Sequence, residues 1–159
     1  MLHIRLIATG SLKEPYWRDA LAEYKKRLNA FAKIEIIELK ECRLPDNPSP
    51  TEIATALEKE ADAVLEALLP RSYVMALCVE GKQLSSEELA ANLSGVMSNQ
   101  GALSLIIGSS HGLAPRVKAK ADYRLSVSKL TFPHQMMRVL LLETVYRSLS
   151  ILHGSKYHK

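Results

Sequence analysis

Two apolar segments, residues 73–79 and 103–107, constrain the fold of this chain most strongly. Each is long enough for a strand and too short for a typical helix, and each is followed by glycine at a turn. Strands that are apolar along their whole length are typical of sheets covered by helices on both faces, and such sheets are mostly parallel. The two segments therefore predict a buried parallel sheet.

The rest of the chain alternates between strand and helix patterns. Helix starts are marked by Pro15, by two Ser-x-x-Glu capping boxes at 49–52 and 85–88, and by Pro115. A long apolar helix covers about residues 134–152. Further strand patterns lie at residues 2–8, 34–39 and 123–127. This alternation predicts one α/β domain over residues 1–159, with a mostly parallel sheet flanked by helices.

In sheets of this kind, ligands bind beyond the carboxyl ends of the strands. The candidate site loops are therefore the ones after Val79, after Ile107 and after Val127. The last helix carries apolar residues around nearly its whole circumference, so it should be buried on more than one side. In a chain of 159 residues, that pattern favours a dimer in which this helix packs on a partner.

Composition narrows the class of protein. The hydrophobic fraction is 47% and no apolar run approaches the length of about 20 residues that spans a bilayer. The amino-terminal residues run straight into a strand without a secretory pattern, so we expect a cytoplasmic protein. Cys42 and Cys78 lack the spacing of a metal or redox motif, and Cys78 is a candidate core residue. The five histidines lack the spacing of metal ligands, so we expect no metal site.

Positive charge is concentrated near the end of the chain. From Arg116 onward there are nine Lys/Arg and two Asp/Glu, a balance of +7, whereas the whole chain carries +4. Such asymmetry is typical of a surface that binds a polyanion, although a solvated helix face would produce it too. Composition leaves both interpretations open.

Short motifs taken one at a time do not identify a functional site. Gly108 and Gly112 fit turn residues as well as a ligand loop, and neither a dinucleotide nor a phosphate-binding glycine motif is present. Ser109, Ser110 and His111 lack the elbow of a serine hydrolase. The apolar loop 130–134 could plug the core or form the wall of a pocket, and the terminal Tyr-His-Lys could be disordered or could hold a nucleobase.

Taken together, several motifs resemble one known family. They are Gly81-Lys82, residues 105–108, Gly112-Leu113, the run 125–134, Arg138-Val139-Leu140, Glu143-x-x-Tyr146-Arg147 and the terminal Tyr157-His158-Lys159. This set, in this order, closely resembles the small SPOUT-class methyltransferases that modify N3 of a pseudouridine in 23S ribosomal RNA. The resemblance runs from end to end of the chain.

The resemblance implies a carboxy-terminal trefoil knot, a homodimer, and S-adenosyl-L-methionine (SAM) as the methyl donor. Transferred by motif position, the SAM pocket would use Leu77, Gly108 and the loop Val127, Ser128, Lys129, Leu130, Thr131 and Phe132. Apolar residues of this loop would form the wall of the adenine site, and Gly108 would admit the ribose and methionine portion.

The resemblance also implies roles at the end of the chain. His158 would orient or deprotonate the base, Tyr157 would stack on it, and Lys159 and Arg138 would stabilise negative charge. Family members often end in Tyr-His-Arg, so Lys159 here lacks the planar fork of arginine. The expected partner is the ribosome or its 23S RNA near helix 69. The competing hypotheses are a non-enzymatic ribosome-associated RNA-binding protein and an enzyme that acts on a small molecule.

Overall fold

The computed structural model describes residues 1–158, and Lys159 lies outside the described residues. Five parallel strands form one sheet in the order β2-β1-β4-β3-β5. Their bounds are β1 Leu2–Thr9, β2 Ala32–Leu39, β3 Tyr73–Lys82, β4 Ala102–Ile107 and β5 Tyr123–Leu125. The predicted α/β class with a parallel sheet is confirmed.

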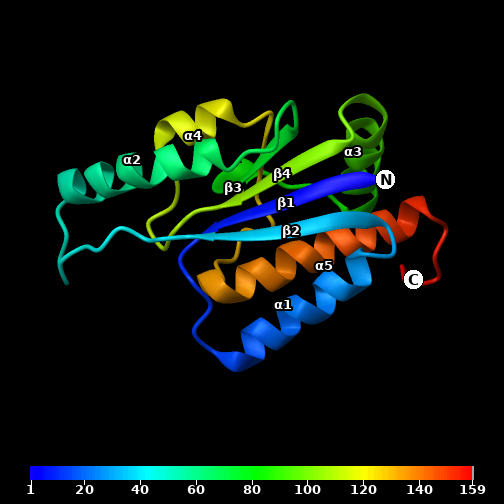
Figure 1. Ribbon diagram of the computed structural model, residues 1–159, viewed down its shortest axis with the longest axis horizontal. Coiled ribbons are helices and arrows are strands. Elements are labelled where there is room, and N and C mark those ends of the chain that lie inside the picture. Colours follow the sequence, from blue (N-terminus) through cyan, green and yellow to red (C-terminus); the bar gives the residue numbers. More distant parts are fainter. Residues whose placement is uncertain (159) are drawn as a thin grey trace.

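Helices cover both faces of this sheet (Figure 1). Their bounds are α1 Pro15–Leu28, α2 Pro50–Glu66, α3 Ser86–Asn99, α4 Pro115–Lys120 and α5 His134–Leu152. In Figure 1, α2 and α4 lie on one side of the sheet and α1 and α5 on the other. Helix α5 packs between α1 and α3. Both predicted capping boxes form: the Ser49 and Ser85 hydroxyls accept from the backbone N–H groups of Glu52 and Glu88.

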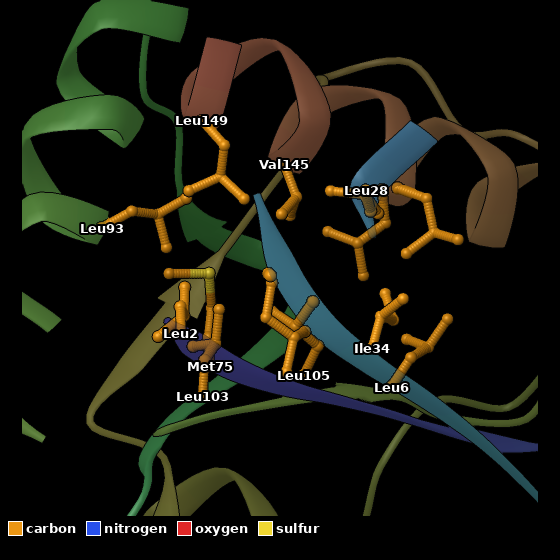
Figure 2. Close-up of a cluster of buried hydrophobic side chains, with 14 of the residues drawn as sticks. Leu2, Leu6, Leu28, Ile34, Met75, Leu93, Leu103, Leu105, Val145 and Leu149 are labelled. Atoms are coloured by element: carbon orange, nitrogen blue, oxygen red, sulfur yellow. The ribbon is translucent and has the colours of Figure 1, made fainter. Parts of the chain in front are cut away.

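The larger hydrophobic core lies between the sheet and the helices α1, α3 and α5. Leu6 and Leu105 on the central strands point toward Leu28 of α1 and toward Val145 and Leu149 of α5 (Figure 2). All five side chains are at most 1% exposed. A smaller cluster on the opposite face packs under α2 and α4. Residues of β3 and β4 contribute to both clusters, which explains the apolar pattern of these two strands.

The largest departure from the predicted elements is at the end of β3. The apolar pattern predicts a strand over 73–79 that is buried on both faces, but β3 continues to Lys82 and Val79 is 76% exposed. The adjoining strand β5 is shorter than predicted and ends at Leu125. Cys78, by contrast, is buried as expected, and burial raises the pKa of its thiol. The burial of Val79 was wrongly predicted because the strand leaves the sheet before it.

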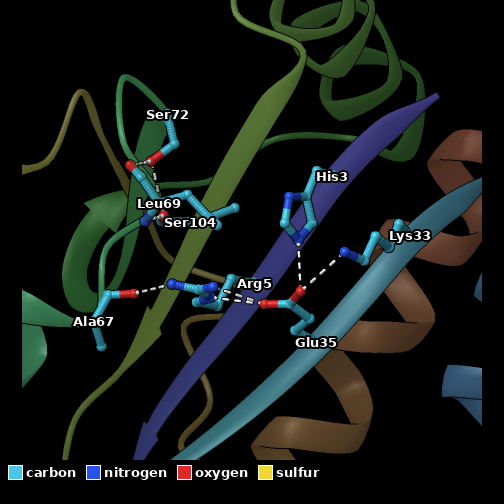
Figure 3. A network of polar contacts seen from close by, with 8 residues as sticks. All are labelled: His3, Arg5, Lys33, Glu35, Ala67, Leu69, Ser72 and Ser104. Atoms are coloured by element: carbon cyan, nitrogen blue, oxygen red, sulfur yellow. Dashed lines mark hydrogen bonds and ion pairs between the residues drawn. The ribbon is translucent and has the colours of Figure 1, made fainter.

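A polar network covers the part of the sheet that α2 and α4 leave open. The Glu35 carboxylate accepts from Arg5 at 2.8 and 3.0 Å and lies 3.1 Å from His3 Nε2 and 3.3 Å from Lys33 Nζ (Figure 3). Arg5 also donates to the Ala67 carbonyl, which links the strands to the end of α2. Hydrogen bonds from Arg5, the largest cause, lower the pKa of Glu35 to about 2.

Replacing Glu35 with Gln should reveal this network as a pH-dependent loss of stability. The folded-state pKa of about 2 lies below the unfolded value of about 4.3. The carboxylate therefore stabilises the fold fully at pH values above about 4.3. This stabilisation is lost as the pH falls through about 2. Urea unfolding should therefore show Glu35→Gln less stable than wild type at pH 7, with a difference that shrinks toward pH 2.

The control is Glu66→Gln, which alters an exposed carboxylate with no ion pair among the residues described. It should unfold like wild type across the same pH range. A constant difference between Glu35→Gln and wild type at all pH values would contradict this account of the network.

Candidate functional site

A cavity of about 420 Å³ opens at the carboxyl ends of β3, β4 and β5. The loops after these three strands and the first turn of α5 line it. All three loops that the sequence singles out therefore border one space. This volume lies within the range of small-molecule sites, and the lining mixes apolar side chains with a few polar groups.

The irregular end of β3 shapes one wall. Leu77 and Lys82 both pair with Leu125 of β5, so the four residues between them leave the sheet. Leu77, Cys78, Val79 and Glu80 consequently line the cavity. Gly81 permits this arrangement, because a Cβ atom there would lie 2.7–2.8 Å from the backbone of β5. The sequence points to Gly81 only through the family motif, since the close approach depends on a strand more than 40 residues away.

Gly108 lines the cavity directly after β4, but the structure gives its glycine a different reason from the predicted one. A Cβ atom on Gly108 would collide with the carbonyl group of Gly112. The Gly112 N–H in turn donates to the Ser109 carbonyl at 2.9 Å, and Gly112 has a φ of +93°. The glycine is therefore required by a tight turn, whether or not a ligand approaches it.

The loop at 127–132 forms the opposite wall. Five of its six residues line the cavity, and the sixth, Lys129, is exposed and does not. In the part of the chain that the structure describes, this loop makes no backbone–backbone hydrogen bond. Its shape is held instead by Ser126 and Ser128, whose hydroxyls bond to the Ser128 carbonyl and the Leu130 N–H at 3.1 and 3.0 Å. Most of its N–H groups are therefore available to a ligand.

Two residues of α5, His134 and Met137, also line the cavity, and sequence reasoning missed both as site residues. His134 is part of the family motif, but its position at the first turn of a helix does not reveal which way it points. Lys118 was missed for a similar reason. It reaches the cavity from α4 and pairs with Glu80 at 2.6 Å.

Arg138 lies in the interior and does not line the cavity. Its side chain is completely buried, and its Nη2 donates to the Gly10 carbonyl at 2.8 Å and lies 3.1 Å from His134 Nε2. Nη1 lies 3.3 Å from Glu38 Oε2. Burial lowers the pKa of the guanidinium, and Glu38 partly opposes this. This placement directs the charge of Arg138 toward β1, β2 and His134, while its predicted role on the nucleobase remains untested.

The described part of the tail packs on the same chain, away from the cavity lining. The Tyr157 hydroxyl donates to Glu143 at 2.9 Å, and the Arg147 guanidinium lies 4.7 Å from the Tyr157 ring. His158 Nε2 lies 2.8 Å from a carboxylate oxygen of Glu87 at the start of α3. Tyr157 and His158 are therefore ordered by specific contacts. Lys159 lies outside the described residues.

Much of the positive charge near the end of the chain is paired with acids. Four of the nine basic residues from Arg116 onward form ion pairs. For example, Arg116 pairs with Glu58 and Asp62, and Lys118 pairs with Glu80. Within residues 1–158, Lys120, Arg124, Lys129 and Lys156 make no ion pair, and all four are exposed. Any basic surface is thus smaller than the balance of charges indicates.

Neither a metal site nor a membrane span emerges from the described residues. No group of three or more His, Cys, Asp or Glu side chains among residues 1–158 could hold a metal ion. No helix within the same range is long and apolar enough to cross a membrane.

Comparison with known proteins places this architecture in a family. The family model described as "Predicted SPOUT methyltransferase" matches residues 2–158. The chain belongs to the SPOUT methyltransferase family. A SPOUT relative in Methanococcus vannielii, described as "Putative ribosomal RNA large subunit methyltransferase H", is 44% identical over 159 residues, which cover 99% of this chain and all of the relative.

Solved structures share the SPOUT fold at much lower sequence identity. A "probable methyltransferase" of Bordetella pertussis aligns with a TM-score of 0.58 and 15% identity, covering 92% of this chain and 95% of that one. A "probable methylase family protein" of Haemophilus influenzae aligns with a TM-score of 0.55 and 13% identity, covering 99% and 70%. At these identities the likeness concerns the fold alone.

Alanine substitutions at two glycines, one in the tight turn beside the cavity and one at an exposed helix position, should have opposite effects on stability. Gly108→Ala should destabilise the protein by about 1–3 kcal/mol, because the methyl group collides with backbone that cannot move cheaply. Gly95 occupies an exposed position of α3 with nothing within 4 Å of an added Cβ atom, so Gly95→Ala should stabilise the protein by up to about 1 kcal/mol. Thermal unfolding of the two variants checks both; equal melting temperatures would contradict the turn's role.

Proposed function

We propose that this protein transfers a methyl group from SAM to N3 of a pseudouridine in the 23S RNA of the large ribosomal subunit, near helix 69. The observation that carries the proposal is the cavity at the carboxyl ends of β3, β4 and β5 in a chain of the SPOUT family. The RNA substrate rests on the name of the 44% identical relative and on the family motifs, and it implies a cytoplasmic protein.

The residues of the cavity fit SAM. Val127, Leu130 and Phe132 offer apolar surface for an adenine ring, opposite Leu77 on β3. The N–H groups of the 127–132 loop without backbone partners suit the polar edge of that ring. Gly108, Ser128 and Thr131 also line the cavity and belong to the proposed cofactor site, together with the exposed Lys129 of the same loop. Bound SAM would supply a methyl group already activated by its sulfonium.

The chain must then hold the base and remove its N3 proton. His158 is the proposed base. Since a carboxylate oxygen of Glu87 can only accept, His158 Nε2 donates to it, which leaves Nδ1 to take up a proton. Nδ1 has no hydrogen-bond partner among the described residues, and it is covered within one chain, so the tail has to move before Nδ1 can reach a base. Tyr157 would stack on the base and Lys159 would stabilise negative charge, whereas buried Arg138 would act through the residues around it.

We also propose that the active site is shared between two copies of the chain. Neither Tyr157 nor His158 lines the cavity of its own protomer. Met136, Val139 and Leu140 on α5 are only half-buried within one chain, which leaves apolar surface for a partner. A homodimer would bury this surface and could bring one tail to the partner's cavity. A carboxy-terminal trefoil knot remains part of the prediction.

His158→Ala tests both the reaction and the role of the tail. Transfer of radiolabelled methyl groups from saturating SAM to large ribosomal subunits should fall by about 10²- to 10⁴-fold, as expected for loss of a general base. SAM affinity, measured by calorimetry, should stay unchanged because the proposed cofactor contacts come from Leu77, Gly108 and the 127–132 loop. The matched control is His153→Ala, which removes an exposed histidine at the end of α5 and should leave transfer intact.

Three results would count against the proposal. Unchanged turnover in His158→Ala would exclude the catalytic role of this residue. A parallel fall in SAM affinity would show that the tail belongs to the cofactor site. No methyl transfer by the wild-type protein to ribosomes, subunits or their RNA would exclude the proposed activity.

A further inference from the structure

His134 is an ionisable side chain on the cavity wall to which the proposed reaction assigns no role. It is the first residue of α5, it lines the cavity, and it is only partly exposed. One helical turn later, Arg138 is the only charged side chain among the largest fully buried ones. The two lie on one face of α5 because residues four apart in a helix are neighbours.

The contact between them determines where the imidazole proton lies. Arg138 Nη2 is 3.1 Å from His134 Nε2. Arginine can only donate hydrogen bonds, so Nε2 must accept. The imidazole is then neutral and carries its proton on Nδ1. A second proton on Nε2 would place two donors against each other and would break this bond.

The other groups that face His134 come from three further segments. The Thr9 carbonyl lies at the end of β1, Glu38 on β2 holds Arg138, and Glu41 follows β2. Gly10 borders this cluster: a Cβ atom there would lie 3.2 Å from Glu41 Oε2, and its φ of +95° favours glycine. Two carboxylates and one guanidinium give the cluster a net charge of −1 while His134 is neutral.

We propose that Arg138 holds His134 as a neutral imidazole. His134 is then a positioning residue, because its neutral form keeps this wall of the cavity suited to a cationic ligand. A protonated His134 would cancel the net negative charge of the cluster beside the cavity. Burial, reinforced by the charge of Arg138, lowers the pKa of His134 from 6.5, which favours the neutral form near pH 7.

This inference rests on the proposed function for the identity of the cation, which is the sulfonium of SAM. S-adenosylhomocysteine (SAH) has the same groups without the methyl group and without the sulfonium charge. Protonation of His134 should therefore weaken SAM more than SAH. The ratio of the two affinities isolates the charge effect, because adenine, ribose and carboxylate contacts are common to both.

The first test needs no ligand. Two-bond ¹H–¹⁵N NMR spectra of the wild-type protein report the tautomer and titration of each histidine. For His134 they should show the proton on Nδ1 at pH 7 and a titration midpoint below 6.5. A proton on Nε2, or a midpoint at or above 6.5, would overturn the inference even if SAM binding and methyl transfer are as proposed.

The second test measures SAM and SAH binding by calorimetry between pH 5 and pH 7. Over this range the amino groups of both ligands stay mostly protonated. Over the part of this range in which NMR shows His134 taking up a proton, the wild-type preference for SAM should fall, because the added positive charge repels the sulfonium. In His134→Asn, the preference should change with pH less than in wild type, because Asn offers Arg138 an oxygen acceptor and cannot take up a proton.

His153→Asn is the matched control, since His153 is an exposed histidine after α5 that does not line the cavity. It should keep the wild-type pH profile. The inference is overturned if His134→Asn keeps that profile, if His153→Asn abolishes it, or if the wild-type preference does not change while His134 takes up its proton. Absence of SAM binding in every variant would instead contradict the proposed function, while the NMR result would still decide the state of His134.

Discussion

The parallel pairing of β3 with both β4 and β5 is the constraint on which the rest of the site depends. Parallel strands end at the same edge of a sheet, so the loops after these three strands meet there. The register shift opposite Leu125 then turns residues 78–81 out of the sheet and opens the cavity between this segment and the 127–132 loop. Without that shift, Val79 would continue the sheet instead of lining the site.

Arg138 joins this edge of the sheet to α5. It bonds to the carbonyls after β1 and to Glu38 on β2, and it contacts His134 at the cavity wall. The two Nη atoms make these contacts, whereas Nε is buried without a hydrogen-bond partner among the described residues. The Nη contacts tie α5 to the strands. The same residue therefore connects folding with the electrostatics of the cavity.

Most of the fold could be predicted from local signals. The capping boxes at Ser49 and Ser85 gave the starts of α2 and α3, and the apolar runs gave β3 and β4, because these signals act within a few residues. The end of β3 could not be predicted, since it depends on pairing with β5 more than 40 residues away. For the same reason the sequence pattern predicts Val79 as a core residue, whereas it is exposed in the structure.

The site was predictable as a set of loops and much less as a set of side chains. Leu77, Gly108 and most of the 127–132 loop line the cavity, as the family motifs imply. His134 and Met137 were missed because helical spacing does not show which residue of a first turn meets a neighbouring loop. The tail contacts of Tyr157 with Glu143 and of His158 with Glu87 were equally hidden, because each joins residues distant in sequence.

The central claim is that the 127–132 loop, with its unpaired N–H groups, holds the methyl donor. Hydrogen–deuterium exchange with and without SAM tests this claim most directly, because backbone amides report their own hydrogen bonds. The account predicts fast exchange at residues 127–132 in the free protein and marked slowing when SAM is bound, with smaller changes at residues 77–80 and 108–112. SAM binding that leaves the exchange of residues 127–132 unchanged would contradict it.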